Sequence, residues 1–320
     1  MRGTFSGRYH GGPGARLTGL IVVSLIGFSV LTTMTEVARG QDERPHLVCS
    51  TTQVADFARQ VVGDRWQVVS ILAAGQDPHL YEVTPNDSRK VRQATLCLEN
   101  GLHLEGSAWM SRLARNEDRP IVTCAQGVMP LQLATANGDE TVADPHAWFT
   151  PLNAAVYVRN IVRGVAEIDT EHQAEYESRG RLYLEQLRTL HAWIRRECNR
   201  IPESRRVLVT SHDAFNYFCA EYGFRTAAPV GWSTGKEVGA GITPARRRAT
   251  VESIREFRVP AIFVETSVNP ELIQQIAQEA GVEIGGKLYS DSMGAPGTAG
   301  ETYLGMMREN VLTIVAGLSE

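Results

Sequence analysis

The stretch 171–199, EHQAEYESRGRLYLEQLRTLHAWIRRECN, decides how this chain is organised. Its apolar residues Tyr183, Leu187, Leu190 and Ile194 recur every three or four positions, which is the spacing of one face of an α-helix. No Gly or Pro interrupts its second half. At about 1.5 Å per residue, the stretch predicts a rod of about 43 Å, long enough to join two lobes stiffly.

The start of this helix is predicted at Thr170, because Thr170 and Gln173 have the spacing of a capping box. On both sides of the helix, short apolar runs alternate with helical stretches, which is typical of βαβ units and a parallel sheet. Strands are predicted before the helix at 46–51, 66–72, 95–100 and 121–123, and after it at 206–210 and 261–265.

The predicted fold is therefore α/β, with two lobes that each contain a parallel sheet flanked by helices. We assign residues 41–150 to an N-terminal lobe, 151–200 to a linker region with the long helix, and 201–320 to a C-terminal lobe. The length of 320 residues agrees with two domains at about 150 residues each. Ligands of such folds bind at the carboxyl ends of the strands, so we expect the functional site in the cleft between the lobes.

The first 40 residues have the pattern of a secretory signal peptide. Three Arg residues precede an apolar run at 17–31, and Ala38-Arg39-Gly40 places small residues at positions −3 and −1 of a cleavage site. We predict cleavage before Gln41 and a periplasmic or other extracytoplasmic location. The alternative is an uncleaved membrane anchor, although the run is near the lower length limit for a spanning helix.

Composition excludes several classes of protein. Charged residues make up 21% and hydrophobic residues 43%, so the chain can bury a core. The net charge of −4 argues against nucleic acid as a partner; without residues 1–40, 28 basic and 35 acidic residues leave −7, which suits a protein that handles cations. The five Cys include no CxxC pair, so we expect buried thiols, with one disulfide left open.

The tripeptide Asp-Pro-His occurs twice, at 77–79 and at 144–146. Pro fixes its own φ and keeps the preceding Asp extended, so each His is presented on a stiff turn. The carboxylate two residues before the His is placed to orient the imidazole as a hydrogen-bond acceptor. That contact decides which ring nitrogen faces a metal ion.

Two further metal-binding side chains lie at strand ends in the second lobe. His212 follows the strand at 206–210, and Asp291 lies in the Ser/Gly-rich loop after residue 289. The intervals between His79, His146, His212 and Asp291 are 67, 66 and 79 residues, far longer than those of local zinc motifs. A site made from these residues has to be assembled across the cleft, with two ligands from each lobe.

From these motifs, residues 46–319 resemble the solute-binding receptors of zinc and manganese ABC importers, the class with a rigid helical linker. The resemblance rests on the stretches GQDPHLYE (75–82), ENGLHLE (99–105), DPHAW (144–148), SHDAFNYF (211–218), FVETS (263–267) and GGKLYSDSMG (285–294). Residue by residue, it implies that His79, His146, His212 and Asp291 are the four metal ligands. It also implies an ABC permease and its ATPase as partners.

The metal itself stays open between manganese and zinc, with iron as a third candidate. By the resemblance, manganese receptors often carry Glu at the third ligand position, where this chain has His212 as zinc-binding and mixed members do. Many zinc receptors also carry a His-rich loop before the second ligand, but the loop at 126–143 contains no His. The closing segment resembles the mixed zinc, manganese and iron branch. Three imidazoles and a carboxylate suit tetrahedral zinc, whereas a bidentate Asp admits manganese or iron.

We therefore predict an extracytoplasmic receptor, not an enzyme, that binds one divalent metal ion and works as a monomer. One alternative is a secreted zinc-dependent hydrolase, which needs an open coordination position. Another is a sister receptor for siderophores or cobalamin, which needs an aromatic or Arg-lined cleft. Glu265 is either a partner of a ligand or a cleft carboxylate, and His103, His172 and His191 are expected outside the site.

Overall fold

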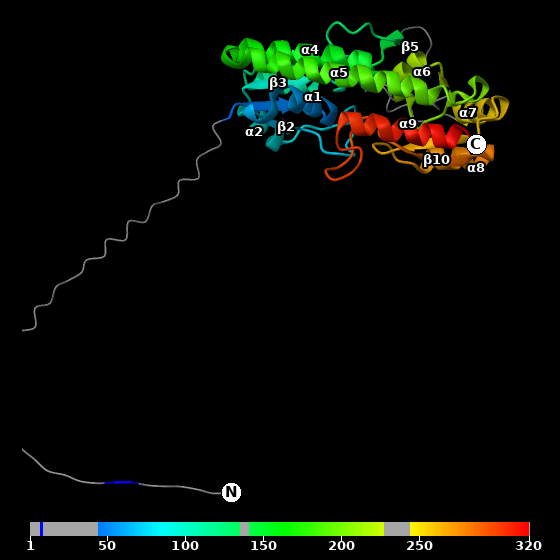
Figure 1. Cartoon of the computed structure of the whole chain (residues 1–320). Helices are drawn as coiled ribbons and strands as arrows, with labels where there is room; N and C mark the ends of the chain where they lie inside the picture. Colours follow the sequence, from blue (N-terminus) through cyan, green and yellow to red (C-terminus); the bar gives the residue numbers. More distant parts are fainter. Residues whose placement is uncertain (1–6, 9–43, 135–140, 227–243, 320) are drawn as a thin grey trace, which may run out of the picture. The chain divides into compact units, whose positions relative to one another are not determined.

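The computed structural model describes residues 7–8, 44–134, 141–226 and 244–319. The residues from Arg44 onward form one compact unit (Figure 1). The predicted signal peptide and its cleavage site lie outside the described residues, apart from residues 7–8. Within the described part of the chain, no helix has the length and apolar character needed to cross a membrane.

The N-terminal lobe is built on a parallel four-stranded sheet in the order β2-β1-β3-β4. Its strands are β1 (His46–Cys49), β2 (Gln67–Ser70), β3 (Leu96–Glu99) and β4 (Ile121–Thr123). Its helices are α1 (Thr52–Val62), α2 (Pro85–Arg92) and α3 (Trp109–Asn116). Neighbouring residues of β1 point to opposite faces: Leu47 packs in the core beside α1, and Val48 packs with Val91 and Trp109. Both faces are covered, which explains the continuous apolar strands.

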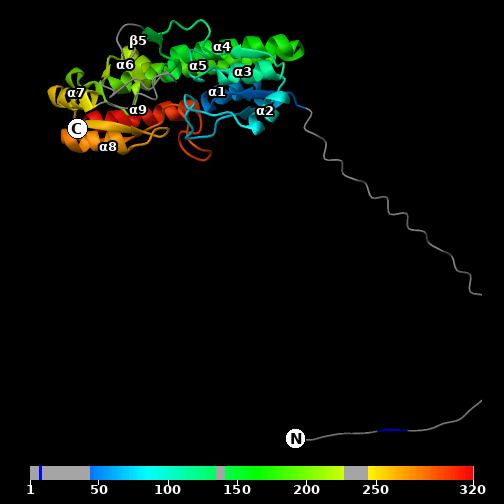
Figure 2. The same ribbon diagram turned by 180° about the vertical axis from the view of Figure 1, so that it is seen from behind.

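The long helix is confirmed as α5 (Gln173–Cys198), which has 26 residues and is about 39 Å long. The predicted apolar positions, from Tyr183 to Ile194, are all buried. Helix α4 (Pro151–Ile168) precedes α5, and the two views of Figures 1 and 2 show these helices side by side. Because α5 contacts α1 and α4 as well as α6 and α9, it packs against both lobes.

The predicted capping box at the start of this helix is wrong. Residues Thr170–His172 form a 3-10 turn, η3, and α5 begins at Gln173 without a side-chain cap. Asp169 fixes the turn instead, since its carboxylate accepts hydrogen bonds from His172 Nδ1 at 2.9 Å and from the Tyr176 hydroxyl at 2.5 Å.

The C-terminal lobe contains two pairs of parallel strands. The pairs are β7 (Val207–Leu208) with β8 (Arg225–Thr226), and β9 (Ala261–Glu265) with β10 (Glu283–Leu288). A hydrogen bond from Phe263 N to Val209 O, at 2.9 Å, connects the pairs. The surrounding helices are α6 (Asn216–Tyr222), α7 (Pro244–Glu256), α8 (Glu271–Ala280) and α9 (Tyr303–Ser319).

Three smaller features lead to the site. The 3-10 helices η2 (Ala147–Phe149) and η5 (Asp213–Phe215) directly follow His146 and His212. The loop before His146 forms an antiparallel pair, β5 (Gln132–Ala134) with β6 (Thr141–Ala143).

All five Cys are buried and free, as expected for small apolar side chains.

Candidate metal centre

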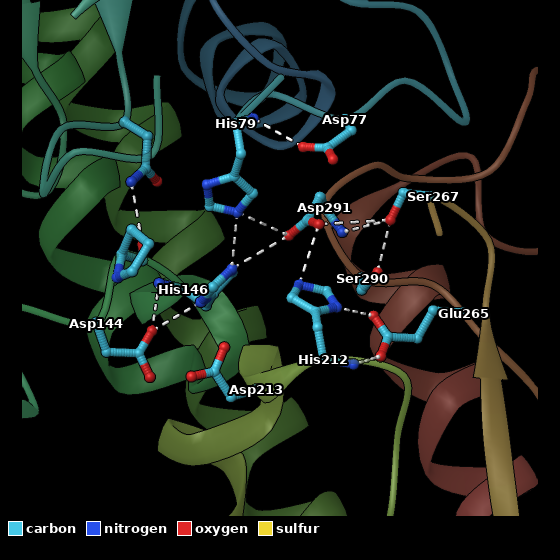
Figure 3. Close-up of polar contacts among 12 residues, drawn as sticks. Asp77, His79, Asp144, His146, His212, Asp213, Glu265, Ser267, Ser290 and Asp291 are labelled. Atoms are coloured by element: carbon cyan, nitrogen blue, oxygen red, sulfur yellow. Dashed lines mark hydrogen bonds and ion pairs between the residues drawn. The ribbon is translucent and has the colours of Figure 1, made fainter. Parts of the chain in front are cut away.

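The structure brings the four predicted ligands, His79, His146, His212 and Asp291, into one buried cluster (Figure 3). One ligand atom from each residue lies within 4.8 Å of all the others. None of the four residues is more than 7% exposed. Residues separated by 66 to 79 positions in the sequence therefore form one candidate site, as the strand-end argument predicts.

Each ligand is placed by the end of an element. His79 lies in the loop between β2 and α2, and His146 lies between β6 and η2. His212 follows β7 with an extended backbone (φ −141°, ψ 176°), and Asp291 follows β10. Three of the four side chains thus come from the carboxyl side of parallel strands, where the two sheets face each other.

The distances between ligand atoms fit a single metal ion. The Nε2 atoms of His79 and His146 are 3.2 Å apart, and His146 Nε2 lies 3.3 Å from Asp291 Oδ1. His212 Nε2 lies 3.2 Å from Asp291 Oδ2. A tetrahedral zinc ion with bonds of about 2.0–2.1 Å places neighbouring ligand atoms about 3.3 Å apart. These three pairs therefore already have the spacing that an ion requires, whereas His79 Nε2 lies farther from Asp291 Oδ1, at 4.0 Å.

The carboxylate of Asp144 orients His146 as predicted. Its Oδ1 accepts hydrogen bonds from His146 Nδ1 at 2.7 Å and from His146 N at 2.9 Å. Asn216 Nδ2 donates to Asp144 Oδ2 at 3.0 Å, and the Tyr217 hydroxyl donates to Asp144 O at 2.9 Å. Because Nδ1 carries the proton in the neutral ring, Nε2 presents its lone pair to the centre of the cluster.

Glu265 contacts His212 in the way that Asp144 contacts His146. It is therefore a partner of a proposed ligand, which was one of the two alternatives left by the sequence. Its Oε2 lies 2.6 Å from His212 Nδ1, and its Oε1 accepts a hydrogen bond from His212 N at 3.0 Å. Glu265 is the last residue of β9 and is 1% exposed. Sequence reasoning placed it at the right sheet edge but could not supply its partner.

The expectation that Asp77 orients the imidazole of His79 is wrong. Asp77 Oδ1 accepts a hydrogen bond from the backbone N of His79, at 2.7 Å, and so fixes the turn rather than the ring. The Nδ1 atom of His79 is buried and has no hydrogen-bond partner among the described residues. The two Asp-Pro-His tripeptides therefore hold their imidazoles in different ways (Figure 3).

These contacts separate the pKa values of the imidazoles. Burial lowers the pKa of His79 to about 3. Burial alone would also lower the pKa of His146, but the carboxylates of Asp144 and Asp291 raise it to about 9. In the same way, Glu265 and Asp291 outweigh burial and raise the pKa of His212 well above its usual value. The site is therefore electrically suited to positive charge at its centre.

Two residues close to Asp291 were not predicted. The Thr52 hydroxyl accepts a hydrogen bond from Met293 N at 2.9 Å, and Gln53 Nε2 donates to Ser290 O at 3.1 Å. Both lie at the start of α1, directly after β1. Their position at the carboxyl edge of the first sheet is the same signal that identified His212, but that signal does not indicate their partners 237 and 241 positions away.

The remaining predicted bystanders stay outside the cluster. His103 is exposed, His172 contacts Asp169 at the start of α5, and His191 contacts the Tyr222 hydroxyl. None of these three histidines belongs to the group of potential ligands found among the described residues. These three histidines therefore lie apart from the cluster of proposed ligands.

Two α/β lobes packed on one long helix, with a buried group of three imidazoles and a carboxylate between them, define a substrate-binding protein of the metal-transporting class. The chain belongs to the family described as zinc-uptake complex component A, periplasmic, whose model matches residues 47–317. This family consists of substrate-binding receptors of ABC transporters rather than enzymes, so the comparisons support the receptor and not the hydrolase.

Individual relatives are similar over nearly their whole length. The manganese-binding lipoprotein MntA of Bacillus subtilis is 35% identical, over 88% of this chain and 92% of its own. The metal ABC transporter substrate-binding lipoprotein SloC of Streptococcus mutans is 31% identical, over 94% of this chain and 97% of its own. The solved structure of the periplasmic zinc binding protein TroA of Treponema pallidum matches with a TM-score of 0.79 and 31% identity, covering 87% of this chain and all of the TroA chain.

Proposed function

We propose that this protein is an extracytoplasmic receptor that binds one divalent transition metal ion through His79, His146, His212 and Asp291. The receptor then delivers the ion to an ABC permease, whose ATPase drives import. The observation that carries the proposal is the convergence of three Nε2 atoms and a carboxylate at 3.2–3.3 Å contacts in a buried place.

The chemistry of this donor set calls for a cation. In the neutral His146 ring, the Nδ1 proton is held by Asp144, so the Nε2 lone pair faces the Nε2 atom of His79 only 3.2 Å away. Two imidazole nitrogens at this distance share a proton in the metal-free site, and a metal ion bound to both takes the place of that proton. All four positions of a tetrahedron are filled by protein atoms, which suits a carrier and leaves no position for an activated water.

The metal is zinc or manganese, with iron as a third candidate. Both oxygens of Asp291 face imidazoles, Oδ1 toward His146 and Oδ2 toward His212. Monodentate binding by this carboxylate gives a tetrahedral zinc site, and bidentate binding gives the higher coordination number that manganese and iron accept. The names of the relatives point both ways, since TroA is called zinc binding and MntA manganese-binding.

The proposal is tested by measuring metal content and affinity directly. Protein purified without chelator should contain about one metal ion per chain, and calorimetric competition between zinc and manganese should rank the two. Saturating metal at about 100 times its Kd should raise the free energy of unfolding by about 2.7 kcal/mol. Asp291→Ala should lose this stabilisation and His191→Ala should keep it; equal stabilisation of both variants would refute the site.

We further propose that the receptor acts as a monomer in the periplasm, or tethered at the membrane if residues 1–40 are retained. The extracytoplasmic location is supported by the lipoprotein relatives and by the family description. Mass spectrometry of the exported protein should show an N-terminus at Gln41 if the predicted cleavage takes place.

A further inference from the structure

The segment 290–293, which carries the ligand Asp291, is hydrogen-bonded to the opposite lobe. It follows β10 and so belongs to the C-terminal lobe by sequence. Three of its hydrogen bonds nevertheless come from the N-terminal lobe, from Thr52, Gln53 and Gly75. The segment that carries one proposed ligand is therefore bound by the other lobe as well as by its own.

Thr52 and Gln53 enclose Asp291 from both sides along the chain. Gln53 Nε2 donates to the carbonyl oxygen of Ser290, at 3.1 Å, and Met293 N donates to the Thr52 hydroxyl, at 2.9 Å. Gln53 is only 2% exposed, so its amide is not a surface contact that water can easily replace. These two side chains of the first turn of α1, named here the α1 clamp, fix the backbone immediately before and after the Asp291–Ser292 pair.

The two members of the α1 clamp also depend on each other. The Thr52 hydroxyl donates its hydrogen to Gln53 Oε1, at 3.2 Å, while its oxygen accepts from Met293 N. This contact turns the Oε1 side of the Gln53 amide toward Thr52 and the Nε2 side toward Ser290. Thr52 therefore acts on the segment both directly and through the orientation of Gln53.

A third contact connects the same segment to the loop that carries His79. Gly75 N donates to the Ser292 hydroxyl, at 2.7 Å. The C-terminal lobe also contacts this segment: Ser267 Oγ lies 2.7 Å from Ser290 Oγ and 3.5 Å from Asp291 Oδ2, and it accepts a hydrogen bond from Asp291 N at 3.4 Å (Figure 3). The segment is therefore held from both lobes, and the α1 clamp holds its backbone at Ser290 O and Met293 N.

From this geometry we propose that Thr52 and Gln53 are positioning residues for Asp291, which hold its carboxylate in register with the three imidazoles and slow the departure of the metal. The inference rests on the proposed function, since it assigns these residues a role at the same metal site. Asp291 cannot move away with the C-terminal lobe while Ser290 and Met293 remain bound to α1. Movement of this segment away from the three imidazoles therefore requires the α1 clamp to open.

The test measures how fast zinc leaves the purified chain when excess chelator is mixed with it in a stopped-flow instrument. Gln53→Met keeps the size of the side chain and removes both polar atoms, and it should raise the dissociation rate about tenfold, the lower end for contacts that orient a metal ligand. Thr52→Val is nearly isosteric and should raise the rate less. Because the hydroxyl orients the amide, the double variant should fall short of the product of the two single effects.

Asn160→Leu is the matched control for a general loss of stability. Asn160 is also a buried amide, but its Nδ2 donates to Cys124 O at 2.7 Å and to Gln126 O at 2.8 Å, away from Asp291. This variant should lower the melting temperature of the metal-free protein and leave the zinc dissociation rate unchanged.

The outcomes separate this inference from the proposed function. If the unmodified chain binds no zinc, manganese or iron, the proposed function fails. If it binds metal and both clamp variants dissociate within about twofold of it, the positioning role is overturned. Should Gln53→Met not fold, Thr52→Val decides the matter alone, because it changes one hydroxyl to a methyl group.

Discussion

The two Asp-Pro-His loops have the same three residues but hold their imidazoles differently. In the loop 144–146, the carboxylate contacts both the backbone N and the ring Nδ1 of His146. In the loop 77–79, the carboxylate accepts only from the backbone N of His79, and the buried Nδ1 has no hydrogen-bond partner among the described residues. An identical tripeptide therefore fixes the turn in both places and the ring in only one.

The difference comes from contacts outside the tripeptide. Asp144 is fully buried and is held by Asn216 and Tyr217 of the C-terminal lobe. Asp77 is only partly buried, and its pKa is raised to about 6 by burial and by the charge of Asp291. A carboxylate thus contacts the ring Nδ1 of His146, and Glu265 contacts that of His212 in the same way. His79 completes the site without such support.

Removal of the imidazoles should give the largest effect on metal binding. Four ligands that share a binding free energy of about 10–16 kcal/mol contribute about 3 kcal/mol each, which is about 100-fold in affinity per ligand. The double variant His79→Ala, His146→Ala should therefore lose stoichiometric binding in calorimetry. Of the two single variants, His146→Ala should lose more, because it removes the supported ring. A larger loss of metal affinity for His79→Ala would contradict the conclusion that His146 is the better supported of the two rings.

The next largest effect should be the pH dependence of metal binding, to which His146 and His79 contribute differently because their pKa values differ. A raised pKa means that His146 and His212 carry protons at neutral pH that the metal must displace, whereas His79, with a pKa lowered to about 3 by burial, carries none. Affinity should thus fall as the pH drops from about 8 to about 6, by up to about tenfold per pH unit for each proton displaced. Calorimetry in buffers with different ionisation enthalpies counts the protons released; a count of zero would contradict this assignment.

The sequence was sufficient to predict the overall plan and the four side chains that the structure brings together as the proposed ligand set. The apolar spacing of Tyr183 to Ile194 predicts α5, and the strand-end positions of His212 and Asp291 predict where the two sheets meet. Two kinds of feature were out of reach. The α1 clamp pairs residues 237 and 241 positions apart, and no local pattern indicates such a contact. The failed capping box at Thr170 has a different cause, because the neighbouring Asp169 holds the turn through the local partners His172 and Tyr176.

The smallest expected effects on metal affinity come from substitution of Asp77 and Asp144, the two aspartates of the tripeptides. Asp144→Asn replaces the acceptor of the His146 Nδ1 proton by a group that can also donate, so it should weaken metal binding by about 10- to 100-fold, as is usual for a partner that orients a ligand. Asp77→Asn keeps an acceptor for the backbone N of His79 and should change the affinity by about threefold or less. Each variant is the control of the other, since both carry the same substitution in the same tripeptide. Equal losses in calorimetric titration would show that Asp77 acts on the metal site after all, through the carboxylate charge that it places near Asp291.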